Sequence, residues 1–223
     1  MGKIQDHQHR PMKVAVIAGS TGLIGGQLLT LLLASDRYTK VIAFTRHELQ
    51  GHPKLIQLNI DGKKMDALDS GSPVDDVFCC LGTTMAKAHT KEKFYHVDFT
   101  LPYLLAKNSL QHGAKRYLLV SSLGANKKSS IYYNQVKGAI EEAISNVGFE
   151  TVHIFRPSLL LGPRLEKRSA EDAAKFFYRI FGFLIPAKYM AIDSLKVARA
   201  MVHYASQHQG GNFIHESTEL QNY

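Results

Sequence analysis

The sequence predicts an α/β fold in which helices cover both faces of a doubly wound, mostly parallel sheet. Two observations predict this fold: nearly continuous apolar runs of strand length recur along the chain, and stretches with helical patterning separate them. A third observation is a glycine-rich turn between the first apolar run and the first helical stretch. In folds of this kind, ligands bind at the carboxyl ends of the strands.

The first half of the chain provides four strands and two helices. Apolar runs predict strands, in chain order, at 13–18, 40–45, 55–58 and 74–80. The glycine turn leads into a helix at about 22–35, and a second helix is expected at about 99–112. Pro102 falls in the first turn of this second helix, where its missing N–H has no intrahelical partner to lose, and Gly113 is a good terminator.

The second half of the chain continues the alternation. The expected elements are strands at 116–121, 151–155 and 212–215, and helices at 131–145 and 194–205. Asp193 is a suitable N-cap for the last of these helices. An amphipathic stretch at 170–181 lies in a segment, about 162–190, that we expect to form a small lid on the substrate side. Packing against the core is the alternative explanation of the aromatic residues in this segment.

The length of 223 residues suits one domain with a sizeable core and is short for two. We expect residues 1–12 to form a flexible polar tail and residues 13–223 to form a single domain. His7 and His9 have a spacing that can bind a metal ion, but nothing near them in the sequence completes a site. No metal is therefore expected.

Charge and composition argue against several other classes of protein. The formal net charge is +8, but the basic residues occur in scattered pairs without a nucleic-acid-binding motif, so no nucleic-acid partner is expected. A basic surface suits an anionic cofactor equally well. The apolar run near the N-terminus is too short to span a bilayer, and neither a signal peptide nor a membrane partner is expected. Cys79 and Cys80 are neighbours on one strand and point to opposite faces, which predicts reduced thiols in a cytoplasmic protein.

The glycine turn has the spacing GxxGxxG. Gly19 lets the chain turn sharply at the end of the strand, Gly22 removes a side chain where a pyrophosphate must approach the backbone, and Gly25 lets helix and strand pack closely. The helix that follows points unpaired N–H groups and a partial positive charge at the same place. We expect a dinucleotide cofactor here, and a purely structural turn is the alternative.

Arg46 follows the second expected strand, where NAD-binding units usually carry an acidic residue that binds the ribose hydroxyls. A cation at this position accommodates a 2′-phosphate instead, and His47 adds a second potential donor. The sequence therefore predicts NADP in preference to NAD. The alternative is that Arg46 is a solvated surface side chain without a ligand.

Tyr133 and Lys137 are four residues apart on a predicted helix and therefore share a face. A charge about 4 Å from the phenol interacts with it by about 4 kcal/mol at an effective dielectric of about 20. This is enough to bring the pKa of a tyrosine from about 10 towards neutrality, where it can act as a general acid. Ser122, at the end of the preceding strand, is expected to hydrogen-bond a substrate carbonyl. Ser121 is the alternative, because neighbouring strand residues point to opposite faces.

The glycine turn, the two serines and the Tyr-x-x-x-Lys pair together resemble the short-chain dehydrogenase/reductase superfamily, in its extended or atypical branch, which has the Rossmann fold. The resemblance extends from Met12 over nearly the whole chain. It is closest to the Tat-interacting-protein-like family of atypical NADPH-binding oxidoreductases and its bacterial relatives, in four stretches at 79–84, 121–125, 133–138 and 155–157. Asp98 stands where many members of the superfamily have an asparagine.

The resemblance implies roles for individual residues. The pyrophosphate would be held by Gly19, Ser20, Thr21, Gly22, Leu23 and Ile24, and the 2′-phosphate would meet Arg46. The ribose and nicotinamide side would be bounded by Leu81, Gly82, Thr83, Pro157 and Leu160, with Arg168 as a further contact. Tyr133 would be the proton donor, and Lys137 would bind the nicotinamide ribose.

The resulting prediction is an enzyme that transfers hydride between NADP(H) and a small carbonyl or alcohol substrate. Tyr133 protonates the carbonyl oxygen, Lys137 tunes Tyr133, and Ser122 orients the carbonyl, while the hydride chemistry belongs to the cofactor. Two alternatives stay open: a regulatory or redox-sensing protein that binds NADPH without turnover, and an enzyme that resembles the nucleotide-sugar epimerases. The chain is expected to be a monomer or a homodimer.

Overall fold

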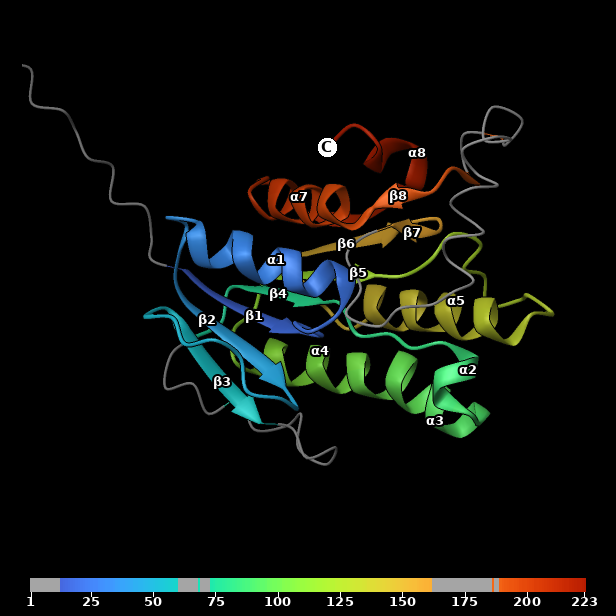
Figure 1. Cartoon of the computed structure of the whole chain (residues 1–223), viewed down its shortest axis with the longest axis horizontal. Coiled ribbons are helices and arrows are strands. Elements are labelled where there is room, and N and C mark those ends of the chain that lie inside the picture. Colours follow the sequence, from blue (N-terminus) through green and yellow to red (C-terminus); the bar gives the residue numbers. More distant parts are fainter. Residues whose placement is uncertain (1–12, 60–67, 69–72, 162–185, 187–188) are drawn as a thin grey trace, which may run out of the picture.

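Seven parallel strands form the sheet at the centre of the computed structural model, which describes residues 13–59, 68, 73–161, 186 and 189–223 (Figure 1). The strand order is β3-β2-β1-β4-β5-β6-β9, and each of these pairs is parallel. The strands are β1 (Lys13–Ala18), β2 (Tyr38–Thr45), β3 (Leu55–Asn59), β4 (Asp76–Cys79), β5 (Arg116–Val120), β6 (Thr151–Arg156) and β9 (Gly211–Glu216). The predicted doubly wound parallel sheet is confirmed. The expected tail at 1–12 and most of the expected lid lie outside the described residues.

Within the described part of the chain, four long helices cover the two faces of the sheet: α1 (Leu23–Ala34), α4 (Leu101–Gln111), α5 (Tyr132–Ser145) and α7 (Ser194–Ala205). Figure 1 shows α1 and α7 above the sheet and α4 and α5 below it. Each strand sends alternate apolar side chains to the two faces, so the core has two layers. Val14 and Val16 of β1 pack on the α4–α5 side, whereas Ala15 and Ile17 pack on the α1–α7 side.

Several short elements were not predicted from the sequence. The region before α4 contains α2 (Met85–Ala88), α3 (Lys91–Tyr95) and a π-helix, η1 (His96–Thr100). Thr84 and Thr90 cap α2 and α3 by accepting hydrogen bonds from backbone N–H groups, so both helix starts carry a recognisable signal. The others are a helix, α8 (Ser217–Leu220), and a two-stranded parallel sheet of β7 (Leu160–Leu161) and β8 (Ile192–Asp193).

The boundaries of the main elements deviate modestly from the predicted ones. Helical backbone before Pro102 begins earlier than predicted, because η1 continues directly into α4, and the proline lies in the first turn of α4 as expected. Strand β2 begins at Tyr38 rather than at residue 40. The hydroxyl of Tyr38 donates a 2.8 Å hydrogen bond to Asp76, a buried contact between distant parts of the chain that local patterning does not reveal.

Asp76 forms ion pairs with three cationic side chains at the amino-terminal edge of the sheet. Its carboxylate is fully buried and lies 2.8 Å from the guanidinium of Arg116, 3.4 Å from the ammonium of Lys13 and 3.5 Å from the guanidinium of Arg37. A buried carboxylate is tolerated only when such partners compensate for its lost hydration. These ion pairs stabilise the edge of the sheet that lies opposite to the carboxyl ends of the strands.

Candidate active site

The carboxyl ends of β2, β1, β4, β5 and β6 lie side by side at one edge of the sheet. After β1 the chain winds outward to β2 and β3, and then returns to the other side of β1 to add β4, β5 and β6. The strand order therefore reverses at β1, which is where doubly wound sheets open a crevice for a ligand. All the loops that carry the predicted site residues within the described part of the chain leave the sheet at this edge.

The three glycines of the turn after β1 differ in how strongly the structure excludes a side chain. Gly19 has a positive φ of 85°, and a Cβ there would lie 2.5 Å from the carbonyl oxygen of Cys80. A Cβ at Gly25 would lie 2.0 Å from the carbonyl oxygen of Gly19. Both positions therefore exclude a side chain, whereas at Gly22 the nearest atom, the Gly19 carbonyl oxygen, is 3.3 Å away. Packing explains Gly19 and Gly25 better than it explains Gly22, the position predicted to face the pyrophosphate.

The start of α1 has the properties of an anion site. Its N-cap is Gly22, which provides no capping side chain, and no acidic residue occupies the first turn. Ser20 is only 3% exposed, and its Oγ makes no hydrogen bond within the described residues. Exposed helix N–H groups and a buried unpaired hydroxyl both call for an acceptor from outside the chain. The residues Gly19 to Ile24 thus fit the phosphates of a dinucleotide.

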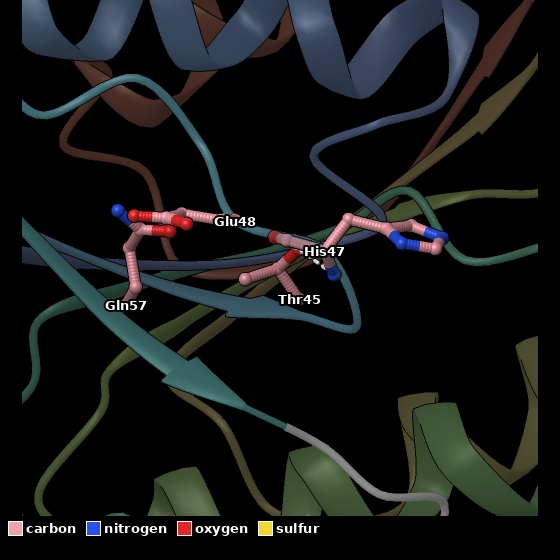
Figure 2. Close-up of a pocket in the computed structure, with 4 residues that line it drawn as sticks. All are labelled: Thr45, His47, Glu48 and Gln57. Carbon is pink, nitrogen blue, oxygen red and sulfur yellow. Dashed lines mark hydrogen bonds between the residues drawn. The ribbon is translucent and has the colours of Figure 1, made fainter.

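A pocket of about 200 Å³ lies beyond the end of β2 and is lined by Thr45, His47, Glu48 and Gln57 (Figure 2). The hydroxyl of Thr45 donates to the backbone oxygen of His47 at 2.6 Å and accepts from its N–H at 3.1 Å, which fixes the turn after the strand. Arg46 is exposed in the same turn. The sequence did not predict Glu48 as a pocket residue, because the expected place of an acidic residue is the strand end itself.

Lys137 is the most strongly constrained of the predicted catalytic residues. It is 4% exposed, and its Nζ lies 2.7 Å from Oδ1 of Asp98 in η1. The other carboxylate oxygen of Asp98 accepts a 2.9 Å hydrogen bond from the backbone N–H of Thr83. Burial lowers the pKa of Lys137, but Asp98 and then Tyr133 raise it by more, so its pKa is above the ordinary value and the ammonium stays charged. The sequence pointed to Asp98 only as a substitution, not as the partner of Lys137.

Tyr133 lies one helical turn before Lys137 on α5 and is half-buried. Its ring packs against Phe94 of α3 at a centroid distance of 5.4 Å, in a small cluster with Ala88 and Val136. The phenol is one of the groups that raise the pKa of Lys137, so the two side chains interact electrostatically as their spacing predicted. The loop after β4 also reaches this place, because a Cβ on Gly82 would lie 3.5 Å from the Lys137 ammonium.

Ser121 and Ser122 follow β5 directly, at the expected edge of the sheet. The N–H of Ser121 donates to the carbonyl of Phe155 at 2.7 Å, and that of Leu123 donates to the carbonyl of Pro157 at 2.9 Å, which ties the ends of β5 and β6 together. Both serine hydroxyl oxygens are buried, and neither has a hydrogen-bond partner in the described part of the chain. The two hydroxyls are alike in this respect, and the choice of Ser122 stays a prediction.

Pro157 and Leu160 lie on the segment that leaves β6. Pro157 is buried, and Leu160 is half-buried in β7. The hydroxyl of Ser158, between them, donates to the backbone oxygen of Met190, and the N–H of Ile192 donates to the carbonyl of Leu159 at 2.9 Å. This segment is thus held against β8. Arg168, the remaining predicted cofactor contact, lies outside the described residues.

Comparison with known proteins gives the same fold and a family. The model of the NAD dependent epimerase/dehydratase family matches residues 15–203. Protein fmp52, mitochondrial, of Emericella nidulans is 35% identical over 179 residues, which are 77% of this chain and 77% of the relative. Protein HTATIP2 of Rattus norvegicus is 33% identical over 208 residues, which are 90% of this chain and 84% of the relative.

Solved structures share the fold at lower identity. The Bordetella bronchiseptica enzyme WbmH in complex with NAD+ has a TM-score of 0.70 at 18% identity, over 92% of this chain and 76% of that one. A short-chain dehydrogenase/reductase family oxidoreductase from Burkholderia thailandensis has a TM-score of 0.71 at 15% identity, over 95% and 94%. At these identities the two likenesses support the fold alone.

The prediction of a cytoplasmic protein is wrong. The relatives from Emericella nidulans, Debaryomyces hansenii and Aspergillus fumigatus, which are 35%, 33% and 35% identical, are named as mitochondrial proteins. The inference from Cys79 and Cys80 failed because reduced thiols indicate a reducing environment and do not distinguish one intracellular compartment from another. No helix among the described residues has the length and apolar character needed to cross a bilayer.

The glycine turn, the Tyr133–Lys137 pair and these comparisons have one common explanation. The chain belongs to the NAD dependent epimerase/dehydratase family of short-chain dehydrogenase/reductase-type proteins, with relatives named FMP52 and HTATIP2.

Proposed function

We propose that this protein is an NADP(H)-dependent oxidoreductase that transfers hydride to or from a small carbonyl or alcohol substrate. The observation that carries the proposal is the pairing of Tyr133 with a buried, charged Lys137, which lies against Gly82 in the loop that leaves the carboxyl end of β4. Burying an ammonium costs free energy, so buried charged groups are frequent at functional sites. Here the ammonium lies within electrostatic range of a phenol.

Some of the site residues would bind the cofactor and the substrate, and Tyr133 would transfer the proton. The backbone from Gly19 to Ile24 and the hydroxyl of Ser20 would hold the pyrophosphate at the start of α1, which has no side-chain cap. Lys137 would hydrogen-bond the nicotinamide ribose, and Ser122 would hold the substrate oxygen. When bound, the cofactor supplies or accepts the hydride.

Tyr133 provides the acid–base step. In the reduction it donates its proton to the substrate oxygen as negative charge develops there, and the neighbouring ammonium of Lys137 stabilises the phenolate that remains. In the oxidation the same phenolate accepts the proton of the alcohol. Phe94, Ala88 and Val136 pack against the ring of Tyr133 and limit its orientations.

The preference for NADP over NAD rests on Arg46. Its side chain is exposed in the turn after β2, next to the pocket that Thr45 and His47 line, where the adenosine ribose lies in folds of this type. A guanidinium there pairs with a 2′-phosphate in a bidentate manner. Glu48 in the same pocket carries the opposite charge, so the relative affinity for the two coenzymes is a direct measure of which side chain reaches the ribose.

The decisive experiment uses two adjacent tyrosines. A panel of aldehydes, ketones and UDP-sugars is tested with NADPH and NADP+ for the parent, for Tyr133→Phe and for Tyr132→Phe. Tyr132 is the matched control because its hydroxyl donates to the backbone oxygen of Lys91 at 3.2 Å, and phenylalanine keeps its ring against Phe94. Loss of carbonyl turnover in Tyr133→Phe alone, with NADPH binding retained, supports the proposal.

The two other functions give different results in the same experiment. A protein that binds NADPH but turns over none of the panel, in the parent as in the variants, is a coenzyme sensor. A parent that interconverts UDP-sugars without net consumption of coenzyme is an epimerase-type enzyme. Either result contradicts the proposed reductase.

A further inference from the structure

Asp98 is the group at this edge whose role the proposed reaction does not explain. It is 1% exposed and lies in η1, a π-helix, which is a rare element that frequently occurs at functional sites. Its two oxygens bind two different parts of the site: Oδ1 lies 2.7 Å from Lys137 Nζ, and Oδ2 accepts from the N–H of Thr83 at 2.9 Å. The carboxylate thus connects the lysine to the loop after β4.

Within the described residues, the titratable groups that act on Lys137 lie on three elements. They are Asp98 from η1, Tyr133 from α5 and Cys79 from β4, and Tyr117 of β5 contacts Cys79 in turn. Burial raises the pKa of the Cys79 thiol and raises that of the Tyr117 phenol well above its ordinary value, so both are neutral near pH 7. Within this set, Asp98 is therefore the group that places a carboxylate against the Lys137 ammonium.

This arrangement changes what Lys137 can do to Tyr133. An unpaired ammonium favours the phenolate strongly, whereas an ammonium in contact with a carboxylate acts on its surroundings as a dipole, whose field is weaker and falls off faster with distance. The hydrogen bond from the Thr83 N–H helps to hold the Asp98 carboxylate in place, and both charged atoms lie against Gly82, where a Cβ would be 3.5 Å from each.

We propose that Asp98 is a positioning residue that compensates the charge of Lys137, so that Tyr133 stays protonated at neutral pH and the site is set for carbonyl reduction rather than alcohol oxidation. The inference rests on the proposed function for its direction. In the reduction, the carbonyl carbon gains the hydride of the dihydronicotinamide, the C=O double bond becomes a C–O–H single bond, and Tyr133 loses its proton to the oxygen. Water then returns a proton to the phenolate, and the oxidised coenzyme leaves.

The test measures the ionisation of one tyrosine. The near-ultraviolet absorbance of phenolate is followed against pH for the parent and for Asp98→Asn, and the curve of the matching protein that also carries Tyr133→Phe is subtracted from each. This isolates one of the ten tyrosines. Asparagine keeps the size of the side chain and an acceptor for Thr83. Asp193→Asn, at the exposed N-cap of α7, is the control for the same substitution.

The proposal predicts that Tyr133 in Asp98→Asn is half-ionised at a pH lower by about one unit or more, a tenfold change in its ionisation constant. The pH above which the rate of carbonyl reduction declines is lower by the same amount. Asp193→Asn changes neither the midpoint of Tyr133 nor this pH limit. An unchanged or higher midpoint in Asp98→Asn overturns the proposal. Because the titration needs no substrate, a downward shift in a protein without turnover supports the charge compensation while removing the reductase assignment.

A second pair of variants covers the case in which Asp98→Asn does not fold with an uncompensated lysine. In the double variant Lys137→Met with Asp98→Asn both charges are absent, so the midpoint of Tyr133 is expected within about half a pH unit of the parent. Lys137→Met alone leaves the carboxylate and is expected to raise the midpoint by about one unit or more. A double variant whose midpoint lies as high as that of Lys137→Met shows that Lys137 acts uncompensated in the parent, and overturns the proposal.

Discussion

His153 Nδ1 lies 2.9 Å from Nε2 of His215, so that two imidazoles share one hydrogen bond inside the protein. His215 Nδ1 lies 2.9 Å from a carboxylate oxygen of Glu219, which can only accept, and the proton of His215 is therefore on Nδ1. His215 Nε2 then accepts from His153 Nδ1, which leaves His153 Nε2 without a proton. That atom is buried and has no hydrogen-bond partner within the described residues, so the fold requires neutral His153.

This geometry predicts acid lability. Burial, and then His215 and Arg116, lower the pKa of His153 to about 4, whereas an unfolded histidine titrates near 6.5. The unfolded state binds more protons in between, so stability falls as the pH drops from about 6.5 and the loss is complete below about 4, at roughly 3 kcal/mol. Urea unfolding of the parent and of His153→Phe across this range measures the difference.

In His153→Phe the decline of unfolding free energy between pH 6.5 and pH 4 should be shallower than in the parent by that amount, whatever the stability at neutral pH. His208→Phe, at an exposed loop position, should keep the slope of the parent. Equal slopes in all three proteins would show that His153 does not titrate in this way.

Gly25→Ala should damage the fold and the cofactor site together. The new methyl group would lie 2.0 Å from the carbonyl oxygen of Gly19, which is backbone and cannot move aside without displacing the turn. A loss of at least about 2 kcal/mol of unfolding free energy and a large loss of NADPH affinity are expected. Thermal unfolding and coenzyme titration measure the two effects.

The neighbouring residue provides the control for this substitution. Gly26 is also in α1, but a Cβ there meets its nearest atom at 3.6 Å, an ordinary contact. Gly26→Ala should be neutral, or stabilising by up to about 1 kcal/mol through helix propensity. A Gly25→Ala protein that is as stable and binds NADPH as well as Gly26→Ala would contradict the role given to the turn.

Asp76→Asn should destabilise the protein without changing the coenzyme site. The substitution leaves Lys13, Arg37 and Arg116 close together without their shared counter-charge, at roughly 3 kcal/mol. Asp75→Asn is the control, because the Asp75 side chain accepts from the N–H of Val14 and an amide oxygen can do the same. The coenzyme affinity of folded Asp76→Asn should equal that of the parent, and a selective loss of affinity would place Asp76 in the binding site instead.

Arg46→Glu should separate the two coenzymes. Reversing the charge removes the partner of a 2′-phosphate and adds repulsion, so the Kd for NADPH should rise at least tenfold more than the Kd for NADH. Arg199→Glu, an exposed position on α7, should affect both coenzymes little. Equal losses for NADPH and NADH in Arg46→Glu would leave the preference for NADP without a structural basis.

The sequence predicted the sheet and the glycine turn because both depend on local signals. Apolar runs marked β1, β2, β4 and β5 within a few residues, and the spacing of Gly19, Gly22 and Gly25 marked the turn. Tyr133 and Lys137 were paired correctly because a helix places residues four apart on one face. These inferences need no knowledge of what packs against what.

The parts that were missed depend on contacts between distant segments. The sequence near Asp98 does not indicate that its carboxylate pairs with Lys137 of α5 and also accepts a hydrogen bond from the Thr83 N–H. Glu48 became visible only when the turn after β2 placed it beside Gln57 of β3. The start of η1 was likewise hidden, because a π-helix has no local pattern distinct from an α-helix.

The central claim is that a nicotinamide coenzyme lies across the strand ends with its reactive ring at Tyr133. Calorimetric titration of the purified protein with NADPH and with NADH, in parallel with Gly25→Ala, tests it most directly. We predict saturable binding at one site per chain, tighter for NADPH than for NADH and lost in Gly25→Ala. Absence of binding of either coenzyme to the folded parent would contradict the account.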